Sequence, residues 1–123
     1  MQDIGPNALA ERDAAITTLR RVFGLRGYDR FETPILEQTE LYIRKSGGAL
    51  SSRLYEFSEP GGLDVSLRPE FTSAILRQFA NATASDGQIR LMYDGPVFRY
   101  ASPEEEDGDK TRQFTQVGAE MIG

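Results

Sequence analysis

Four side chains near the end of the sequence are spaced so that they could act together. Arg112, Phe114, Gln116 and Glu120 differ by even numbers. Side chains on a β-strand repeat with a period of two, so one face of a strand would carry all four. The sequence contains no histidine and no cysteine, which removes imidazole bases, thiol nucleophiles and the usual zinc ligands. Any chemistry on this face must therefore use carboxylates, arginine, lysine and backbone groups.

Two further charged residues follow short stretches that constrain them. Arg99 lies in the run "GPVFRY", and its planar guanidinium can hold two oxygen atoms of an anion at once, which lysine cannot do. On its own, Arg99 fits a surface ion pair better. Glu70 follows Pro69 in "SLRPEFT", where a carboxylate can also favour the start of a helix through the helix dipole. Position alone does not separate that role from ligand binding.

The first elements that would position these residues are predicted by the spacing of apolar side chains. Residues 7–26 carry them at nearly helical intervals and are followed by Gly27, which predicts an amphipathic helix. The run "DRFETPILEQ" alternates apolar and polar residues but contains Pro34, which predicts an interrupted strand at an edge or an interface. Residues 39–45 predict a short helix.

Two hairpins and a second long helix complete the predicted fold. "RLYEF" and "DVSLRP" flank the turn "SEPGG", and "QIRLMYDGPVFRYA" and "RQFTQVGAEMIG" flank the solvated loop "SPEEEDGDKT", so each pair is expected to be antiparallel. Residues 70–82 place Phe71 and Ile75 on one helical face. Tyr55 and Phe57 are expected to pack in the core. This order predicts an α+β fold, a mostly antiparallel sheet with flanking helices.

Composition limits the kind of protein. A chain of 123 residues predicts one domain. Its net charge of −5 argues against nonspecific nucleic-acid binding as the main task, since lysine and arginine supply most of that affinity. No apolar run approaches the roughly 20 residues of a membrane span, and the first residues are not those of a signal peptide. A cytoplasmic location without membrane contact is expected, as is the absence of a metal site.

Four segments together resemble the catalytic core of class II aminoacyl-tRNA synthetases of the histidyl type. "GYDRFETPILEQTELYIRKSG" looks like the first class II motif, with Pro34 at the place of the dimer-interface proline. "SLRPEFT" is similar to a segment of histidyl-tRNA synthetases, and "GPVFRY" and "RQFTQVGAEMIG" look like the two strands of the second motif. The resemblance implies that residues 1–123 are the N-terminal part of such a catalytic domain, with motifs 1 and 2 only, and that the protein is a homodimer.

The resemblance also implies a role for each candidate residue. Arg99 would be the catalytic residue, holding the α-phosphate of ATP and the carboxylate of the amino acid. The ATP-binding residues would be Arg99, Lys110, Arg112 and Phe114, whose ring would stack on adenine. The amino-acid-binding residues would be Glu70 and Thr72, near the ammonium group, and Gln116 and Glu120, near the imidazole of histidine. ATP with Mg would enter as a substrate, and no cofactor is expected to be tightly bound.

The departures from the family pattern leave two functions open. Ala101 and Ser102 replace a Glu-Arg pair, and the five carboxylates of "EEEDGD" replace a basic loop that reaches ATP and tRNA; such a run would repel phosphate. The sequence stops at Gly123, directly after a strand, and lacks the third motif. We therefore expect a truncated core that is inactive alone. The parent would be a histidine-tRNA ligase or, alternatively, the histidine-binding regulatory subunit that partners the ATP phosphoribosyltransferase catalytic subunit in histidine biosynthesis.

Overall fold

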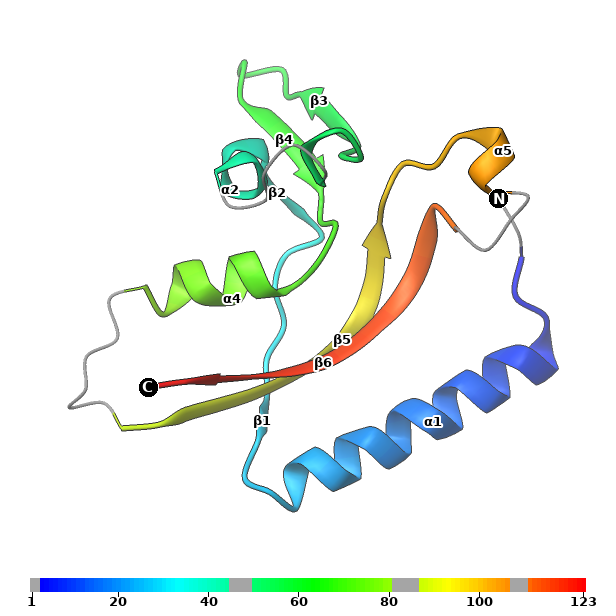
Figure 1. The fold of residues 1–123 in the computed structure, drawn as a ribbon, viewed down its shortest axis with the longest axis vertical. Helices are drawn as coiled ribbons and strands as arrows, with labels where there is room; N and C mark the ends of the chain where they lie inside the picture. The colour runs from blue at the N-terminus through cyan, green and yellow to red at the C-terminus, as the bar shows by residue number, and fades with distance from the viewer. Residues whose placement is uncertain (1–2, 45–49, 81–86, 107–110) are drawn as a thin grey trace.

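A long two-stranded hairpin organises the molecule. The computed structural model describes residues 3–44, 50–80, 87–106 and 111–123. Strands β5 (Ile89–Phe98) and β6 (Gln113–Ile122) pair antiparallel in continuous register, from Ile89 opposite Ile122 to Phe98 opposite Gln113. Figure 1 shows this hairpin crossing the molecule, with α1 along one side and α4 on the other. The predicted long-looped hairpin is confirmed.

Helix α1 (Pro6–Gly24) covers one face of the hairpin through a few polar contacts. It confirms the helix predicted for residues 7–26, and a proline occupies its first turn, where no backbone donor is needed. None of its residues is fully buried in this chain. Among the described residues, no helix is long and apolar enough to cross a lipid bilayer.

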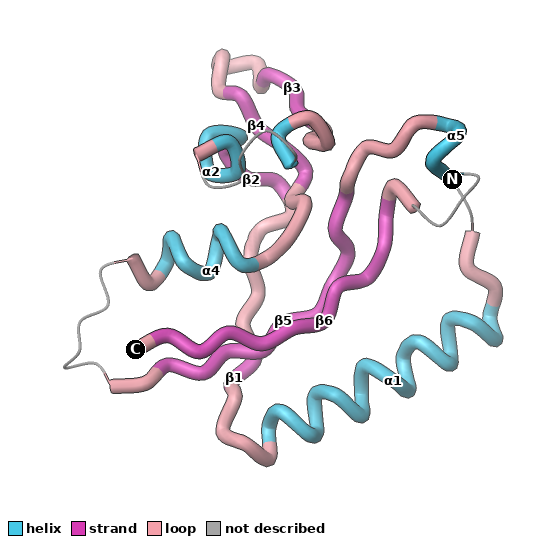
Figure 2. The backbone as a smooth tube through the Cα atoms, viewed as in Figure 1, coloured by secondary structure: helices cyan, strands magenta, loops and turns pink. Residues whose placement is uncertain are grey.

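The predicted interrupted strand is confirmed, and its two halves lie in different sheets. Strand β1 (Asp29–Arg30) runs parallel to β5, so the first sheet has the order β1-β5-β6. Strand β2 (Leu36–Gln38) instead pairs antiparallel with β4 (Asp64–Leu67), which also pairs with β3 (Glu56–Ser58). The order of the second sheet is β2-β4-β3 (Figure 2). The α+β fold with mostly antiparallel strands is confirmed, with its strands divided between two small sheets.

The core lies between α4 (Thr72–Gln78) and the hairpin. Its buried residues are Phe71, Ile75, Leu91, Tyr93 and Val97. The predicted helix of residues 70–82 is confirmed over a shorter range, since its described part ends at Gln78 and residues 81–82 lie outside the described part of the chain. The expectation for Phe57 was wrong, because the side chain on the short edge strand β3 is 50% exposed.

Arg68 joins the two sheets. Its Nε donates to the carbonyl of Pro96 (2.9 Å) and its Nη1 to the carbonyl of Thr33 (2.6 Å). Its backbone carbonyl also accepts from the amide of Phe98 at 3.0 Å. The residue is only 2% exposed, and burial lowers the pKa of its guanidinium. Buried donors need partners, and here the partners are backbone carbonyls on β5 and on the segment that joins β1 to β2.

Two short helices flank the second sheet and the loop of the hairpin. Helix α2 (Thr39–Ile43) confirms the short helix predicted there. Helix α5 (Pro103–Glu106) lies inside the segment predicted as an irregular loop, so that prediction was wrong for these residues. Ser102 and Glu105 cap this turn reciprocally: the amide of Ser102 donates to Glu105 Oε2 (3.1 Å) and the amide of Glu105 donates to Ser102 Oγ (3.3 Å). This capping box is what orders the turn.

Candidate functional site

The candidate residues of the hairpin share the face that α4 covers. Arg99, just beyond β5, pairs with Arg112, because its amide donates to the Arg112 carbonyl at 2.9 Å. Arg112 is four residues from Gln116, an even separation, so Arg99 and Gln116 lie on one face.

Arg99 and Phe114 are in direct contact on this face. The guanidinium carbon of Arg99 lies 5.1 Å from the centroid of the Phe114 ring, within the range of a cation–π interaction. Its Nε donates to the carbonyl of Pro69 at 2.9 Å. The backbone hydrogen bond fixes the orientation of the guanidinium, and no carboxylate is paired with it among the described residues. An oriented guanidinium beside a half-buried ring can bind an anion attached to an aromatic group.

Gln116 presents an unused acceptor. Its Oε1 is buried and has no hydrogen-bond partner among the described residues. Gly95 lies directly opposite it in the hairpin, and a Cβ at Gly95 would lie 2.7 Å from Nη2 of Arg68. The space that a side chain at Gly95 would take is occupied by Arg68 and by the ring of Phe71, whose Cζ would lie 3.1 Å from that Cβ. A buried acceptor without a donor is unfavourable by about 1–3 kcal/mol unless a ligand or water supplies the donor.

Glu120 is held by two hydroxyl groups. Thr72 Oγ1 donates to Oε1 of Glu120 at 2.6 Å, and the Tyr93 hydroxyl donates to the same oxygen at 3.3 Å. Thr72 is the first residue of α4, whereas Tyr93 and Glu120 belong to β5 and β6. Three elements therefore fix one carboxylate, and both of these hydrogen bonds go to the same oxygen, Oε1.

The position of Glu70 is compatible with both roles considered for it, the start of a helix and ligand binding. Its two carboxylate oxygens accept from the amide of Ser73, each at 3.1 Å. This contact satisfies a free amide at the start of α4. The carboxylate is only half-buried and keeps further lone pairs. Glu70 can therefore cap the helix and accept from an ammonium group together.

Arg112 contacts the start of the acidic loop. Its Nε donates to the Ala101 carbonyl at 3.0 Å, and its guanidinium carbon lies 5.6 Å from the centroid of the Tyr100 ring. Glu105, on α5, forms an ion pair with Arg53 at 2.9 Å. The loop thus folds back on the segment before β3. Lys110, the remaining predicted ATP ligand, lies outside the described residues.

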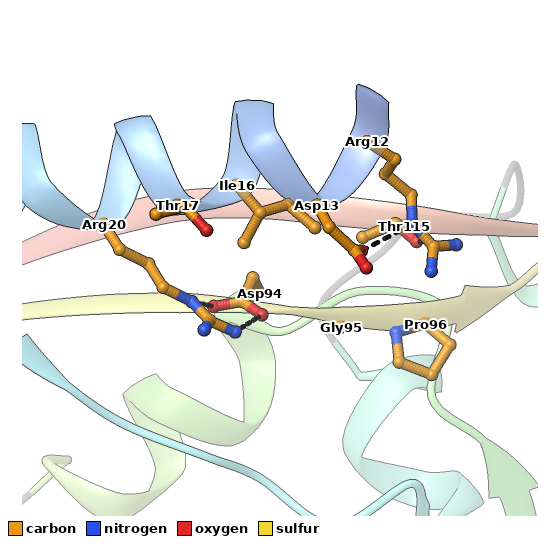
Figure 3. A pocket seen from close by; sticks show the side chains of 9 residues that line it. All are labelled: Arg12, Asp13, Ile16, Thr17, Arg20, Asp94, Gly95, Pro96 and Thr115. Atoms are coloured by element: carbon orange, nitrogen blue, oxygen red, sulfur yellow. Dashed lines mark hydrogen bonds and ion pairs between the residues drawn. The ribbon is translucent and has the colours of Figure 1, made fainter. Parts of the chain in front are cut away.

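The opposite face of the hairpin carries a cleft unrelated to the predicted site. It has a volume of about 460 Å³ and lies between α1 and β5–β6. Figure 3 shows Arg20 of α1 reaching Asp94 of β5, and Arg12 reaching Thr115 of β6. Arg20 donates to both carboxylate oxygens, at 2.7 and 2.5 Å. The hydrogen bonds from Arg20, assisted by the charges of Arg20 and Arg30, lower the pKa of Asp94. No predicted site residue lines this cleft.

Pro34 lies at the surface of this chain. Pro34 is exposed between β1 and β2, and the neighbouring Ile35 and Leu36 are 44% and 40% exposed. Within the described ranges, no three aspartate, glutamate, histidine or cysteine side chains are grouped to hold a metal ion.

Two contributors to this site were not foreseen. Tyr93 was treated as an ordinary strand residue, although its even separations from Leu91 and Val97 would have placed it on the same face. Arg53 gave no sequence signal, because its ion pair with Glu105 spans 52 residues.

Comparisons with known proteins show which family the chain belongs to. A sequence model of histidyl-tRNA synthetase matches residues 1–123. A histidine-tRNA ligase of Geobacter metallireducens is 38% identical over 98% of this chain and 30% of its own length. One of Pyrococcus horikoshii is 36% identical over 99% of this chain and 28% of its length. The chain thus spans less than a third of these curated relatives.

Two solved structures share the fold. An ATP phosphoribosyltransferase regulatory subunit/histidyl-tRNA synthetase from Bacillus halodurans matches with a TM-score of 0.82 at 28% identity, covering 100% of this chain and 31% of that one. The apo histidyl-tRNA synthetase of S. aureus matches with a TM-score of 0.72 at 29% identity, covering 97% and 27%. The chain thus has the fold of histidyl-tRNA synthetase-like structures. The chain belongs to the histidyl-tRNA synthetase family.

Proposed function

We propose that this chain supplies the histidine-binding residues and part of the ATP-binding residues of a cytoplasmic histidine-tRNA ligase. Activation of histidine is an in-line attack of its carboxylate on the α-phosphate of ATP, with pyrophosphate as leaving group. Such a site must hold two anions together and stabilise the charge that develops on phosphorus. The observation that carries the proposal is the single face on which Arg99, Phe114, Gln116 and Glu120 lie.

Each residue has a role that its contacts allow. Arg99 would bind the α-phosphate and the histidine carboxylate, and Phe114 would stack on the adenine of ATP, which enters with Mg. Arg112 and Lys110 would bind the other phosphates. Glu120 and Gln116 would bind the imidazole, because they offer a carboxylate oxygen and a buried acceptor without a partner. Glu70 and Thr72, at the start of α4, would receive the ammonium group.

A chimera tests the proposal. The segment of the Geobacter metallireducens ligase that aligns with this chain would be replaced by residues 1–123, and histidine-dependent pyrophosphate exchange would be measured. We expect exchange, and we expect its loss in the same chimera with Arg99→Ala. The isolated chain should show no exchange, because each missing charge-stabilising donor can contribute about 10²–10³ in rate. A folded chimera that binds histidine but does not catalyse exchange would overturn the ligase proposal.

The acidic loop favours a second candidate, the histidine-binding regulatory subunit of ATP phosphoribosyltransferase. Arg53 neutralises Glu105, but the other four carboxylates of "EEEDGD" would oppose the approach of ATP and tRNA. The test is to mix the protein with an ATP phosphoribosyltransferase catalytic subunit. Complex formation and histidine-dependent change of that activity would support the regulator, and their absence would exclude it.

A further inference from the structure

The Tyr93 ring packs closely between Phe71 and Gly118. The side chain is 6% exposed, and its ring stacks on Phe71 with centroids 4.5 Å apart and planes at 17°. On the other side it lies against Gly118, its partner across the hairpin. A Cβ at Gly118 would lie 2.4 Å from the Tyr93 hydroxyl oxygen and 2.5 Å from its Cζ. Only glycine at position 118 leaves room for the ring to lie flat on β6.

This packing directs the Tyr93 hydroxyl to Glu120, which lies two residues after Gly118 on β6. The hydroxyl and Thr72 Oγ1 both donate to Oε1 of Glu120. Burial raises the pKa of the Tyr93 hydroxyl, and the nearby negative charge of Glu120 acts in the same direction. Tyr93 therefore stays protonated and remains a donor at neutral pH. A phenylalanine would fill the same space, so packing alone does not require the hydroxyl.

We propose that Tyr93 is a positioning residue of the histidine site, which with Thr72 holds Oε1 of Glu120 so that Oε2 accepts the N–H of the bound imidazole. The proposal rests on the function proposed above. A carboxylate without these two donors could rotate and share its oxygens among other groups. Held as it is, it offers one acceptor in a defined direction, which favours a side chain carrying an N–H donor over an apolar ring of similar size.

The test compares Tyr93→Phe and Thr72→Val with two matched controls, Tyr28→Phe and Thr115→Val, which remove the same hydroxyl groups elsewhere. L-Histidine binding to the 123-residue chain would be measured by calorimetry. We expect each site variant to weaken binding about tenfold, the equivalent of about 1.4 kcal/mol, and the controls to bind like the parent. Thr72→Ser, which keeps the hydroxyl, should restore most of the affinity.

A double-mutant cycle separates positioning from a general loss of packing. In Glu120→Gln, the added Tyr93→Phe change should have little further effect on binding, because its partner carboxylate is gone. If Tyr93→Phe weakens binding equally in both backgrounds, the hydroxyl does not act through Glu120 and the inference is wrong. Parent-like binding by Tyr93→Phe would overturn it as well.

A ligand-free measurement keeps this inference distinct from the proposed function. The side-chain carboxyl ¹³C resonance of Glu120 would be compared at pH 7 in the parent, Tyr93→Phe and Tyr28→Phe. A shift in Tyr93→Phe alone supports the contact, and an unchanged resonance refutes it. If L-histidine binds to no variant and not to the parent, the proposed function fails, whereas this resonance still decides whether Tyr93 holds Glu120.

Discussion

Arg99 is held in place by one backbone carbonyl and one aromatic ring, which leaves donors of its guanidinium for a ligand. We expect Arg99→Ala to weaken ATP binding by about 1.5–3 kcal/mol, the usual contribution of a charged hydrogen bond. Titration of the chain with ATP and Mg measures this. Arg90→Ala is the matched control, since Arg90 lies on the exposed part of β5 and donates to Gln88. Equal ATP affinities of Arg99→Ala and the parent would contradict the ATP role of Arg99. Phe114→Ala should lose the stacking contact with adenine.

Asp94 should make stability depend on pH in the acid range. Arg20, with Arg30, lowers its pKa in the folded chain, so the contribution is present above the unfolded pKa, about 3.9, and is lost as pH falls through the lower folded value. We expect Asp94→Asn to reduce the free energy of unfolding by about 1–2 kcal/mol at pH 6. This range is set low because Arg20 is 38% exposed, so that solvent screens its charge.

The check is urea denaturation of both proteins from pH 6 to pH 2. The difference between them should shrink below about pH 4. Asp3→Asn, at an exposed position, is the control. A constant difference across this range would mean that the ion pair with Arg20 is not its origin.

The sequence predicted which residues of one strand share a face, because side-chain alternation is a local property of the backbone. That reasoning placed Arg112, Phe114, Gln116 and Glu120 on one face, whereas the position of Arg99 on the same face depends on how β5 and β6 pair. The partners of these residues were not predictable. Thr72 and Tyr93 reach Glu120 from elements 48 and 27 residues away, and no local rule specifies such contacts.

Among the elements, β6 carries the strictest steric requirement at Gly118. We expect Gly118→Ala to destabilise the chain by about 1–3 kcal/mol, the range for overpacking, because the added Cβ would displace the Tyr93 ring. Gly24→Ala is the matched control: a Cβ there meets nothing within 4 Å, and alanine favours the helix. Thermal denaturation distinguishes the two variants. A parent-like melting temperature for Gly118→Ala would contradict the close packing of the Tyr93 ring against Gly118.

The element boundaries that sequence analysis missed have local causes. Helix α5 was predicted as loop because its composition is acidic, yet Ser102 and Glu105 form the reciprocal cap that starts a helix. The spacing of serine and glutamate was visible in the sequence. The division of the interrupted strand between two sheets was not, because it depends on which distant strands, β5 and β4, pair with each half.

For the whole molecule, the exposed segment around Pro34 predicts self-association. Ile35, Leu36 and Ile43 are 44%, 40% and 52% exposed, and apolar surface of this kind is often an interface between subunits. We expect sedimentation velocity to show dimer at high concentration and monomer in Leu36→Glu. Met121→Glu changes an equally apolar side chain, 57% exposed, and should not alter the assembly. Monomer at every concentration would exclude a dimer formed by this chain.

The hydrogen bonds of Arg68 should couple the thermal unfolding of the two sheets. A small sheet is stable only when its apolar face packs against a neighbour, and here one guanidinium donates both to β5 and to the segment between β1 and β2. Local unfolding of either sheet would leave this buried cation without its acceptors, so the two halves should lose structure in a single cooperative calorimetric transition, with equal van't Hoff and calorimetric enthalpies. In Arg68→Met the coupling would be gone, and the second sheet should exchange its amide hydrogens as an independent, less protected unit.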